Sequence, residues 1–182
     1  MLRILRQLWR VGVVTEPQPS TEQVEMEALG LELRRAIDAR FRHSLAIRVV
    51  DAGSCNGCEL EIHALSNPYY DIERFGVSFV ASPRHADALL VTGPVSRHME
   101  MALRRTWRAM SAPKFVIAAG QCAVGGGVFG ESYACCGAVD KVLPVDVKIP
   151  GCPPSPEALL RGLLTALRAE SPTVNSGRAT SA

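Results

Sequence analysis

Four of the six cysteines in this chain lie in short, loop-like sequences and could bind a metal or carry out redox chemistry. Cys55 and Cys58 form a C-x-x-C pair in SCNGCE, Cys122 follows AGQ, and Cys152 lies in PGCPPSP. No secretory leader is visible at the start of the chain, where arginines interrupt the apolar residues, so we expect a reducing compartment. Clustered cysteines in such a compartment bind metals or do redox chemistry more often than they form disulfides.

The elements that must position these cysteines alternate between short apolar runs and helical segments. Strands are expected at Leu45–Val50, Val77–Ala81, Ala88–Thr92, Phe115–Ala119 and Val142–Ile149. Helices are expected between them, near Cys58–Leu65, Glu100–Met110 and Glu157–Arg168. Apolar strands separated by helices indicate a parallel sheet that is covered on both faces. The predicted fold class is therefore α/β, with a flavodoxin-like, doubly wound parallel sheet.

This fold makes the positions of the cysteines informative. In an open parallel sheet, the loops that follow the strands emerge at one edge, formed by the carboxyl ends of the strands. Cys55 and Cys58 follow the first expected strand, Cys122 the fourth and Cys152 the fifth. We therefore expect four thiols from distant parts of the chain to converge at the C-terminal edge of the strands.

Four converging thiolates suit either a [4Fe–4S] cluster or a tetrahedral zinc ion. Structural zinc usually takes two closely spaced pairs, whereas this chain offers one pair and two single cysteines. Proline follows Cys152, as it follows the last cysteine in ferredoxin-type cluster sequences. These features favour the cluster and leave zinc open.

Two other kinds of site fit these residues less well. A thioredoxin-like dithiol at Cys55 and Cys58 leaves the other two loop cysteines unexplained. A phosphate loop for a flavin at residues 120–130 matches neither the Walker pattern nor the dinucleotide fingerprint. The adjacent Cys135 and Cys136 are predicted to be small buried residues.

Composition places the chain among ordinary globular proteins. It has 182 residues, of which 47% are hydrophobic and 21% charged, with a net charge of +2. These values exclude a disordered or collagen-like chain, and the balanced charge with 5% aromatic residues argues against a nucleic-acid partner. No run of residues is apolar for long enough to cross a membrane.

Three parts of the chain are expected: residues 1–43, an α/β domain at 44–169, and a disordered polar tail at 170–182. The first part is predicted to dock on a partner or a membrane. It starts with apolar residues near helical spacing and arginines between them, namely Leu2, Leu5, Leu8 and Trp9 with Arg3, Arg6 and Arg10. A helix from Thr21 to about Arg42 follows.

Several motifs resemble one known family of small iron–sulfur subunits. Its members occur in energy-converting, formate hydrogenlyase-like [NiFe] hydrogenases and in complex I, where the corresponding protein is the 20 kDa (B) subunit. The motifs are CNGCELEI at 55–62, ERFGV at 73–77, SPRHADALLVTGPV at 82–95, GQCAVGGG at 120–127 and DKVLPVDVKIPGCPPSPEALLRGLL at 140–164. GVVTEP at 12–17 is similar to the start of several such subunits. The C-x-G-C-E form at residues 55–59 is similar to the hydrogenase branch, because complex I carries two adjacent cysteines there.

The resemblance implies one [4Fe–4S] cluster with four cysteine ligands, Cys55, Cys58, Cys122 and Cys152. It implies electron transfer to or from a catalytic large subunit of a membrane-associated hydrogenase, with no catalysis by this chain alone. The other partners implied are a ferredoxin-like iron–sulfur subunit and membrane subunits, and the implied location is peripheral, on the cytoplasmic side of the inner membrane. The alternatives are a complex I-like or hydrogenase-related subunit that passes electrons to quinone, and a zinc-stabilised interaction module.

Four charged or titratable residues near the expected cluster are further candidates. Glu59 and Glu61 adjoin the cysteine pair and could relay protons, or they could be solvated carboxylates at a helix start. Arg84 and His85 are expected in the loop after the second strand, at the same edge of the sheet. There they would tune the cluster's potential, or Arg84 would bond to nearby carbonyls.

Overall fold

The central sheet of the computed structural model, which describes residues 2–11 and 21–168, contains five strands that are all parallel. They are β1 (Leu45–Asp51), β2 (Val77–Phe79), β3 (Ala88–Thr92), β5 (Phe115–Ala119) and β7 (Val147–Ile149). Their order, β2-β1-β3-β5-β7, is the flavodoxin-like order, which confirms the predicted class. The chain changes direction across the sheet after β2, so the switch point lies between β1 and β3.

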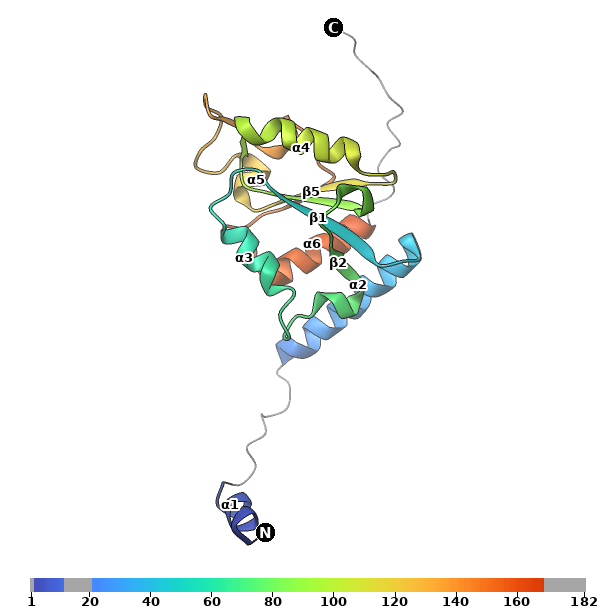
Figure 1. Cartoon of the computed structure of the whole chain (residues 1–182), viewed down its shortest axis with the longest axis vertical. Helices are drawn as coiled ribbons and strands as arrows, with labels where there is room; N and C mark the ends of the chain where they lie inside the picture. The colour runs from blue at the N-terminus through green and yellow to red at the C-terminus, as the bar shows by residue number, and fades with distance from the viewer. Residues whose placement is uncertain (1, 12–20, 169–182) are drawn as a thin grey trace.

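Helices cover both faces of the sheet (Figure 1). One face packs against α2 (Thr21–Phe41), α3 (Gly57–Ala64) and α6 (Pro156–Arg168), and the other against α4 (Arg97–Ala109) and α5 (Gln121–Gly125). Successive side chains of a strand alternate between the two faces. Leu90 and Ile117 therefore belong to the first core, while Val91 and Val116 belong to the second. Three short 3₁₀ helices complete the connections: η1 (Ile72–Phe75), η2 (Pro83–His85) and η3 (Val139–Lys141).

The last predicted strand, residues 142–149, is wrong over its first half. Val142 ends η3 and is buried with Leu143 in the second core, so these apolar side chains pack from a loop. Pro144 has no N–H to give to a ladder. The carboxylate of Asp146 accepts the N–H of Val116 at 2.7 Å, which ties the loop to β5 just before β7 begins.

A small antiparallel pair lies beside the main sheet and was not predicted. It consists of β4 (Val95–Ser96) and β6 (Cys135–Gly137). Strands of two or three residues show no alternation that could be recognised in the sequence.

The predicted boundary at residue 43 does not separate two cores. Helix α2 packs against α6, and its Met26, Leu33 and Ile37 are buried in the same core as the sheet. Only its outward face, with Val24 and Leu31 exposed, remains for contacts outside the chain.

The first helix, α1 (Leu2–Val11), lies apart from the α/β domain (Figure 1). The predicted tail, 170–182, and the sequence GVVTEP fall outside the described residues. Within the described residues, no helix combines the length and the apolar character needed to cross a bilayer.

The packing of α2 leads to a stability prediction. Leu33 is fully buried, so we expect Leu33→Ala to lower the free energy of unfolding by about 2–5 kcal/mol through lost burial and a residual cavity. The matched change Leu31→Ala, in the same helix at a side chain that is 44% exposed, should cost less than about 1 kcal/mol. Denaturant unfolding of the full chain measures both. Equal effects would show that α2 is not an integral part of the core.

Candidate metal centre

The loop after β1 places the first two cysteines at the carboxyl edge of the sheet. Asp51 accepts the backbone N–H groups of Gly53 and Ser54 through Oδ1, at 2.8 and 2.7 Å, and so forms a tight turn. Asn56 then adopts a left-handed conformation, with φ of 70°, immediately before α3. Cys58 is consequently buried in the first turn of α3, whereas Cys55 remains exposed in the loop.

Hydrogen bonds join the loops after β5 and β7 to each other. The N–H of Gly120 donates to Ile149 O at 2.9 Å, and the N–H of Gln121 donates to Gly151 O at 2.6 Å. Cys122 lies in α5 directly after this connection, and Cys152 directly follows Gly151. The two loops therefore hold their cysteines at a common place beside the end of the sheet.

Glycines line the space around the sulfur atoms. A Cβ atom on Gly120 would lie 2.5 Å from Cys58 Sγ, and one on Gly127 would lie 2.5 Å from Cys122 Sγ. Both glycines have positive φ angles, of 92° and 57°, which disfavour a side chain as well. The backbone thus approaches the thiols more closely than any other residue type would allow.

The pKa values of two thiols, those of Cys58 and Cys122, are raised in part by the other cysteines of this edge. Burial, then the charges of Glu59, Cys55, Cys122 and Cys152, raises the pKa of the Cys58 thiol to about 11. Burial likewise raises the pKa of Cys122, followed by the charges of Cys152, Cys55 and Cys135. Thiols that repel one another as anions favour a cation between them, because metal ligation replaces their protons with positive charge.

The donors available at this edge are four free thiols. A tetrahedral zinc ion brings its sulfurs to within ~3.8 Å of one another, because Zn–S bonds are ≈ 2.3 Å long. Across the part of the chain that the structure describes, no three Cys, His, Asp or Glu side chains come close enough to share one ion. In a cubane each thiolate binds a separate iron, which leaves the sulfurs further apart.

Of the two predicted carboxylates, Glu59 is the one held at this edge. Its Oε2 accepts a hydrogen bond from Ser54 Oγ at 2.6 Å, and its Oε1 accepts one from Thr92 Oγ1. Thr92 is a fully buried polar residue at the carboxyl end of β3, beside the switch point. Glu61 lies two residues further along α3 and contributes to the charge near Tyr70 instead.

A pocket beside Glu59 connects this carboxylate with the surface. It has a volume of ≈ 400 Å³, and its lining includes Arg48, His63 and Glu73 besides Glu59. The Nε atom of Arg48 is buried there and has no hydrogen-bond partner among the described residues. A pocket of this size with several polar groups can hold water molecules that bridge Glu59 to solvent.

Arg84 and His85 lie away from the thiols. Both belong to η2 and are exposed, and η2 leads directly into the amino end of β3. The expected position at the carboxyl edge fails because β2 is short and ends beside Ile47, midway along β1. Neither residue is among the groups whose charge shifts the pKa of Cys58 or Cys122.

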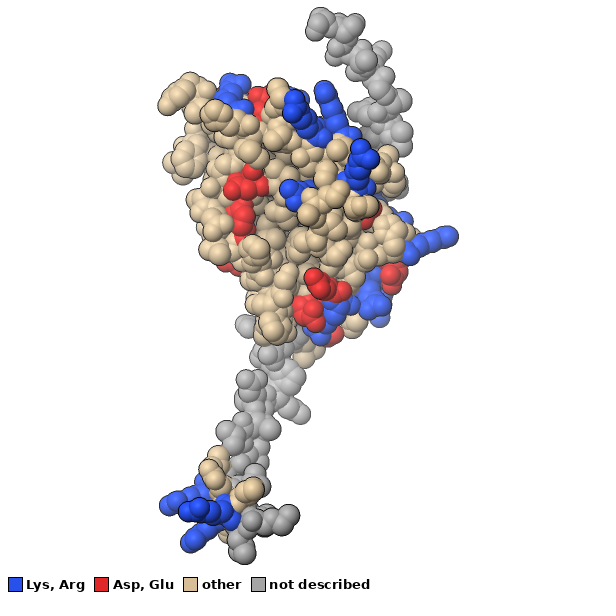
Figure 2. Space-filling view, in the orientation of Figure 1, with Lys and Arg blue, Asp and Glu red and all other residues tan. Residues whose placement is uncertain are grey.

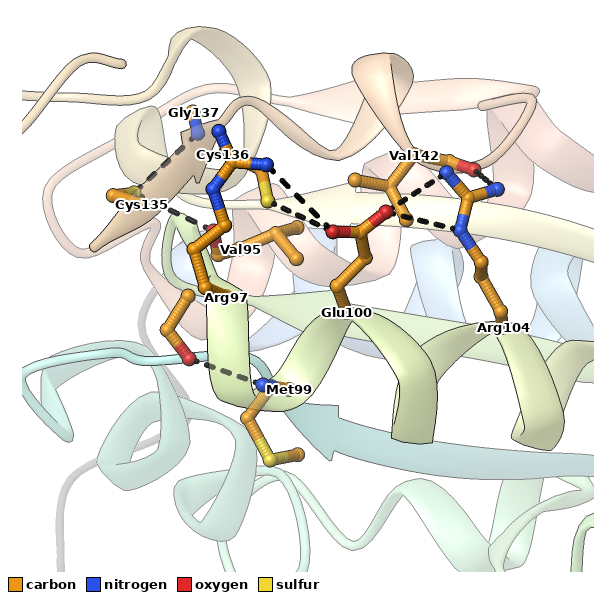
Figure 3. Close-up of polar contacts among 10 residues, drawn as sticks. Val95, Arg97, Met99, Glu100, Arg104, Cys135, Cys136, Gly137 and Val142 are labelled. Atoms are coloured by element: carbon orange, nitrogen blue, oxygen red, sulfur yellow. Dashed lines mark hydrogen bonds and ion pairs between the residues drawn. The ribbon is translucent and has the colours of Figure 1, made fainter. Parts of the chain in front are cut away.

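The adjacent cysteines of β6 belong to a different network (Figure 3). Both are buried, as predicted. The Cys136 thiol lies 3.3 Å from Glu100 Oε2 of α4, and Arg104 binds the other oxygen of that carboxylate at 3.1 Å. The Cys135 thiol lies 3.5 Å from Val95 O, which joins the two short strands. These contacts attach β6 to β4 and α4 rather than to the four thiols.

Sequence reasoning missed the hydroxyls of Ser54 and Thr92, which hold Glu59. Ser54 directly precedes the cysteine pair, and Thr92 ends an otherwise apolar run. A lone polar residue at the carboxyl end of a buried strand is the signal that could have identified Thr92.

Comparisons with known proteins agree with this geometry. The family described as "NADH ubiquinone oxidoreductase, 20 Kd subunit" matches residues 55–166. Formate hydrogenlyase subunit 7 of Escherichia coli is 44% identical over 151 residues, which cover 83% of this chain and 58% of that protein, so the chain spans less than two thirds of it. The probable membrane-bound hydrogenase subunit mbhJ of Pyrococcus furiosus is 52% identical over 118 residues, covering 65% of this chain and 71% of the relative.

Among solved structures, a chain of the membrane-bound sulfane sulfur reductase, an archaeal respiratory membrane complex, is similar with a TM-score of 0.61. Its sequence identity is 34%, and the match covers 75% of this chain and 73% of that one. The likeness therefore extends over most of the α/β domain.

The contact between Gly120 and Cys58 can be tested by substitution. We expect Gly120→Ala to lower the free energy of unfolding by about 1–3 kcal/mol, because the new methyl group meets the thiol and the backbone there disfavours a side chain. Gly125→Ala is the matched control, since its Cβ would meet only Gln121 Nε2 at 3.7 Å. Thermal unfolding of both variants measures the difference in stability. Equal stability of the two variants would contradict the close approach of Gly120 to the Cys58 thiol.

Proposed function

The chain belongs to the family of the 20 kDa subunit of NADH–ubiquinone oxidoreductase, which confirms the resemblance seen in its motifs. On this premise we propose that it is the electron-transfer subunit of a membrane-associated hydrogenase complex and carries one [4Fe–4S] cluster. The observation that carries the proposal is the convergence of three loops that bring four free cysteines to one glycine-lined edge of the sheet.

The residues that hold the cluster in this proposal are Cys55, Cys58, Cys122 and Cys152. When bound, such a cluster accepts and releases one electron at a time. The chain's own contribution is to hold the thiolates in three connected loops and to bring backbone close to their sulfurs at Gly120 and Gly127. Backbone dipoles this close to the sulfurs can tune the reduction potential of a bound cluster.

Glu59 is the side chain we propose as the proton carrier of this edge. Its carboxylate accepts hydrogen bonds from Ser54 and Thr92 and also borders a pocket that opens to the surface. A carboxylate that can exchange a proton beside a redox group couples its charge to the charge of that group. Glu61 has no comparable position.

The proposed partners follow from the names of the relatives. Formate hydrogenlyase and a membrane-bound hydrogenase both need a catalytic partner, which we propose to be a large subunit that holds the nickel–iron site. A ferredoxin-like iron–sulfur subunit would supply or remove electrons, and membrane subunits would place the chain peripherally on the cytoplasmic side of the inner membrane. The chain is then a redox component of an oxidoreductase complex and does not turn over substrate alone.

Membership of the 20 kDa family is also consistent with a second candidate function, that of a subunit that delivers electrons to quinone. The C-x-x-C spacing of Cys55 and Cys58 favours the hydrogenase branch. Nickel analysis of the copurified large partner separates the two, since only the hydrogenase requires nickel.

Replacing single cysteines tests the ligand set. We expect the anaerobically purified wild-type chain to show visible iron–sulfur absorbance and about four irons and four sulfides, and each of Cys58→Ser and Cys122→Ser to abolish both. Cys135→Ser and Cys136→Ser are matched controls, because these thiols bond to Val95 and Glu100 instead, and both should retain the cluster. Zinc without sulfide in the wild-type chain would refute the cluster and leave an interaction module.

Substitution of Glu59 tests the proton carrier. In the wild-type chain, the midpoint potential of the cluster should fall as pH rises, by up to ~59 mV per pH unit for one proton per electron. Glu59→Gln keeps an oxygen to accept hydrogen bonds but removes the carboxylate, so the midpoint potential of this variant should vary less with pH. Glu61→Gln should behave like the wild type. A potential that depends on pH equally in all three would assign the proton to another group.

A further inference from the structure

Helix α1 separates charge from apolar surface around its axis. At 100° per residue, Arg3, Arg6 and Arg10 fall within an arc of about 60°. Trp9, Ile4 and Val11 occupy positions outside that arc. The helix contains no acidic residue, so the three arginines have no anionic partner on it. Figure 2 shows the resulting basic group on α1, which lies apart from the domain.

The apolar side chains of α1 are presented to solvent. Trp9 is 95% exposed, Ile4 66% and Val11 57%. An arginine arc beside exposed apolar side chains is the pattern of a helix that lies in a membrane interface, with its apolar side in the acyl region and its basic side at the headgroups. Tryptophan prefers this depth because its ring is apolar and its N–H is polar.

We infer that α1 binds directly to an anionic lipid bilayer and lies in its surface. Charge complementarity identifies this occupant, because α1 carries three arginines and no acidic residue, and arginine side chains can reach lipid phosphates while their stems cover apolar surface. The inference deepens the proposed peripheral placement by naming a contact that the chain makes itself, besides any contact through membrane subunits.

The expected strength follows from the charges. Each arginine near an anionic membrane surface contributes roughly a factor of five to the affinity, so three together amount to ~100-fold. This attraction is screened by salt, whereas the apolar contribution is not. One helix of ten residues thus gives reversible attachment rather than a permanent anchor.

Vesicle flotation of the full chain tests the inference. The chain should bind vesicles of phosphatidylcholine with added phosphatidylglycerol and bind poorly to phosphatidylcholine alone, and salt should weaken the binding. Changing Arg3, Arg6 and Arg10 together to Gln should lower the affinity by ~100-fold. The matched control changes three exposed arginines of the domain, Arg35, Arg105 and Arg108, to Gln, and should retain most of the binding.

Fluorescence reports the depth of the helix. The contribution of Trp9 to the tryptophan fluorescence is the difference between the spectra of the wild-type chain and the Trp9→Phe variant. It should shift to shorter wavelength on anionic vesicles, because Trp9 leaves water. Absence of binding, equal binding to both kinds of vesicle, or equal losses in the two triple variants would overturn the inference. The Cys58→Ser chain should bind vesicles normally, so loss of the cluster and loss of lipid binding remain distinguishable outcomes.

Discussion

The close approach of Cys58 to Gly120 is the contact on which the arrangement of this edge depends. It joins the first turn of α3 to the loop after β5, which in turn is hydrogen-bonded through Gln121 to Gly151 in the loop after β7. Three loops from distant parts of the chain are thereby packed against one another before any ligand is considered. A residue with a side chain at position 120 would push the first loop away from the other two, and the thiols would no longer share one space.

The six cysteines illustrate how environment separates chemistry from packing. The thiols of β6 each have a polar partner, a backbone carbonyl for Cys135 and the Glu100 carboxylate for Cys136, so their polar needs are met within the second core. Burial raises the pKa values of Cys58 and Cys122, and the charges of other loop thiols raise them further, so a cation bound between these thiols is favoured. Cysteine therefore packs as a small buried residue in β6, whereas at the carboxyl edge of the sheet it is placed to bind a cation.

The parallel α/β sheet could be predicted because it follows from uninterrupted apolar runs that are separated by helical segments. Residues 142–146 could not be assigned correctly, since Val142 and Leu143 are as apolar as strand residues but pack from a loop. The position of Arg84 depended on how far β2 extends, which its sequence does not reveal. The link from Glu59 to Thr92 joins helix α3 to the carboxyl end of β3 and appears only when β1 and β3 are paired.

Because the thiols are distributed over three loops, the time for which a group stays bound depends on how often these loops open. A ligand that needs all three loops is released when any one of them opens, and conversely its binding must suppress the opening of each. Strands β1, β5 and β7 have no covalent connection at this edge other than the long crossovers between them. Binding of the group and cooperative closure of the three loops are therefore described by the same equilibrium. Hydrogen-exchange rates of the backbone amides of Gly120 and Gln121 would measure it.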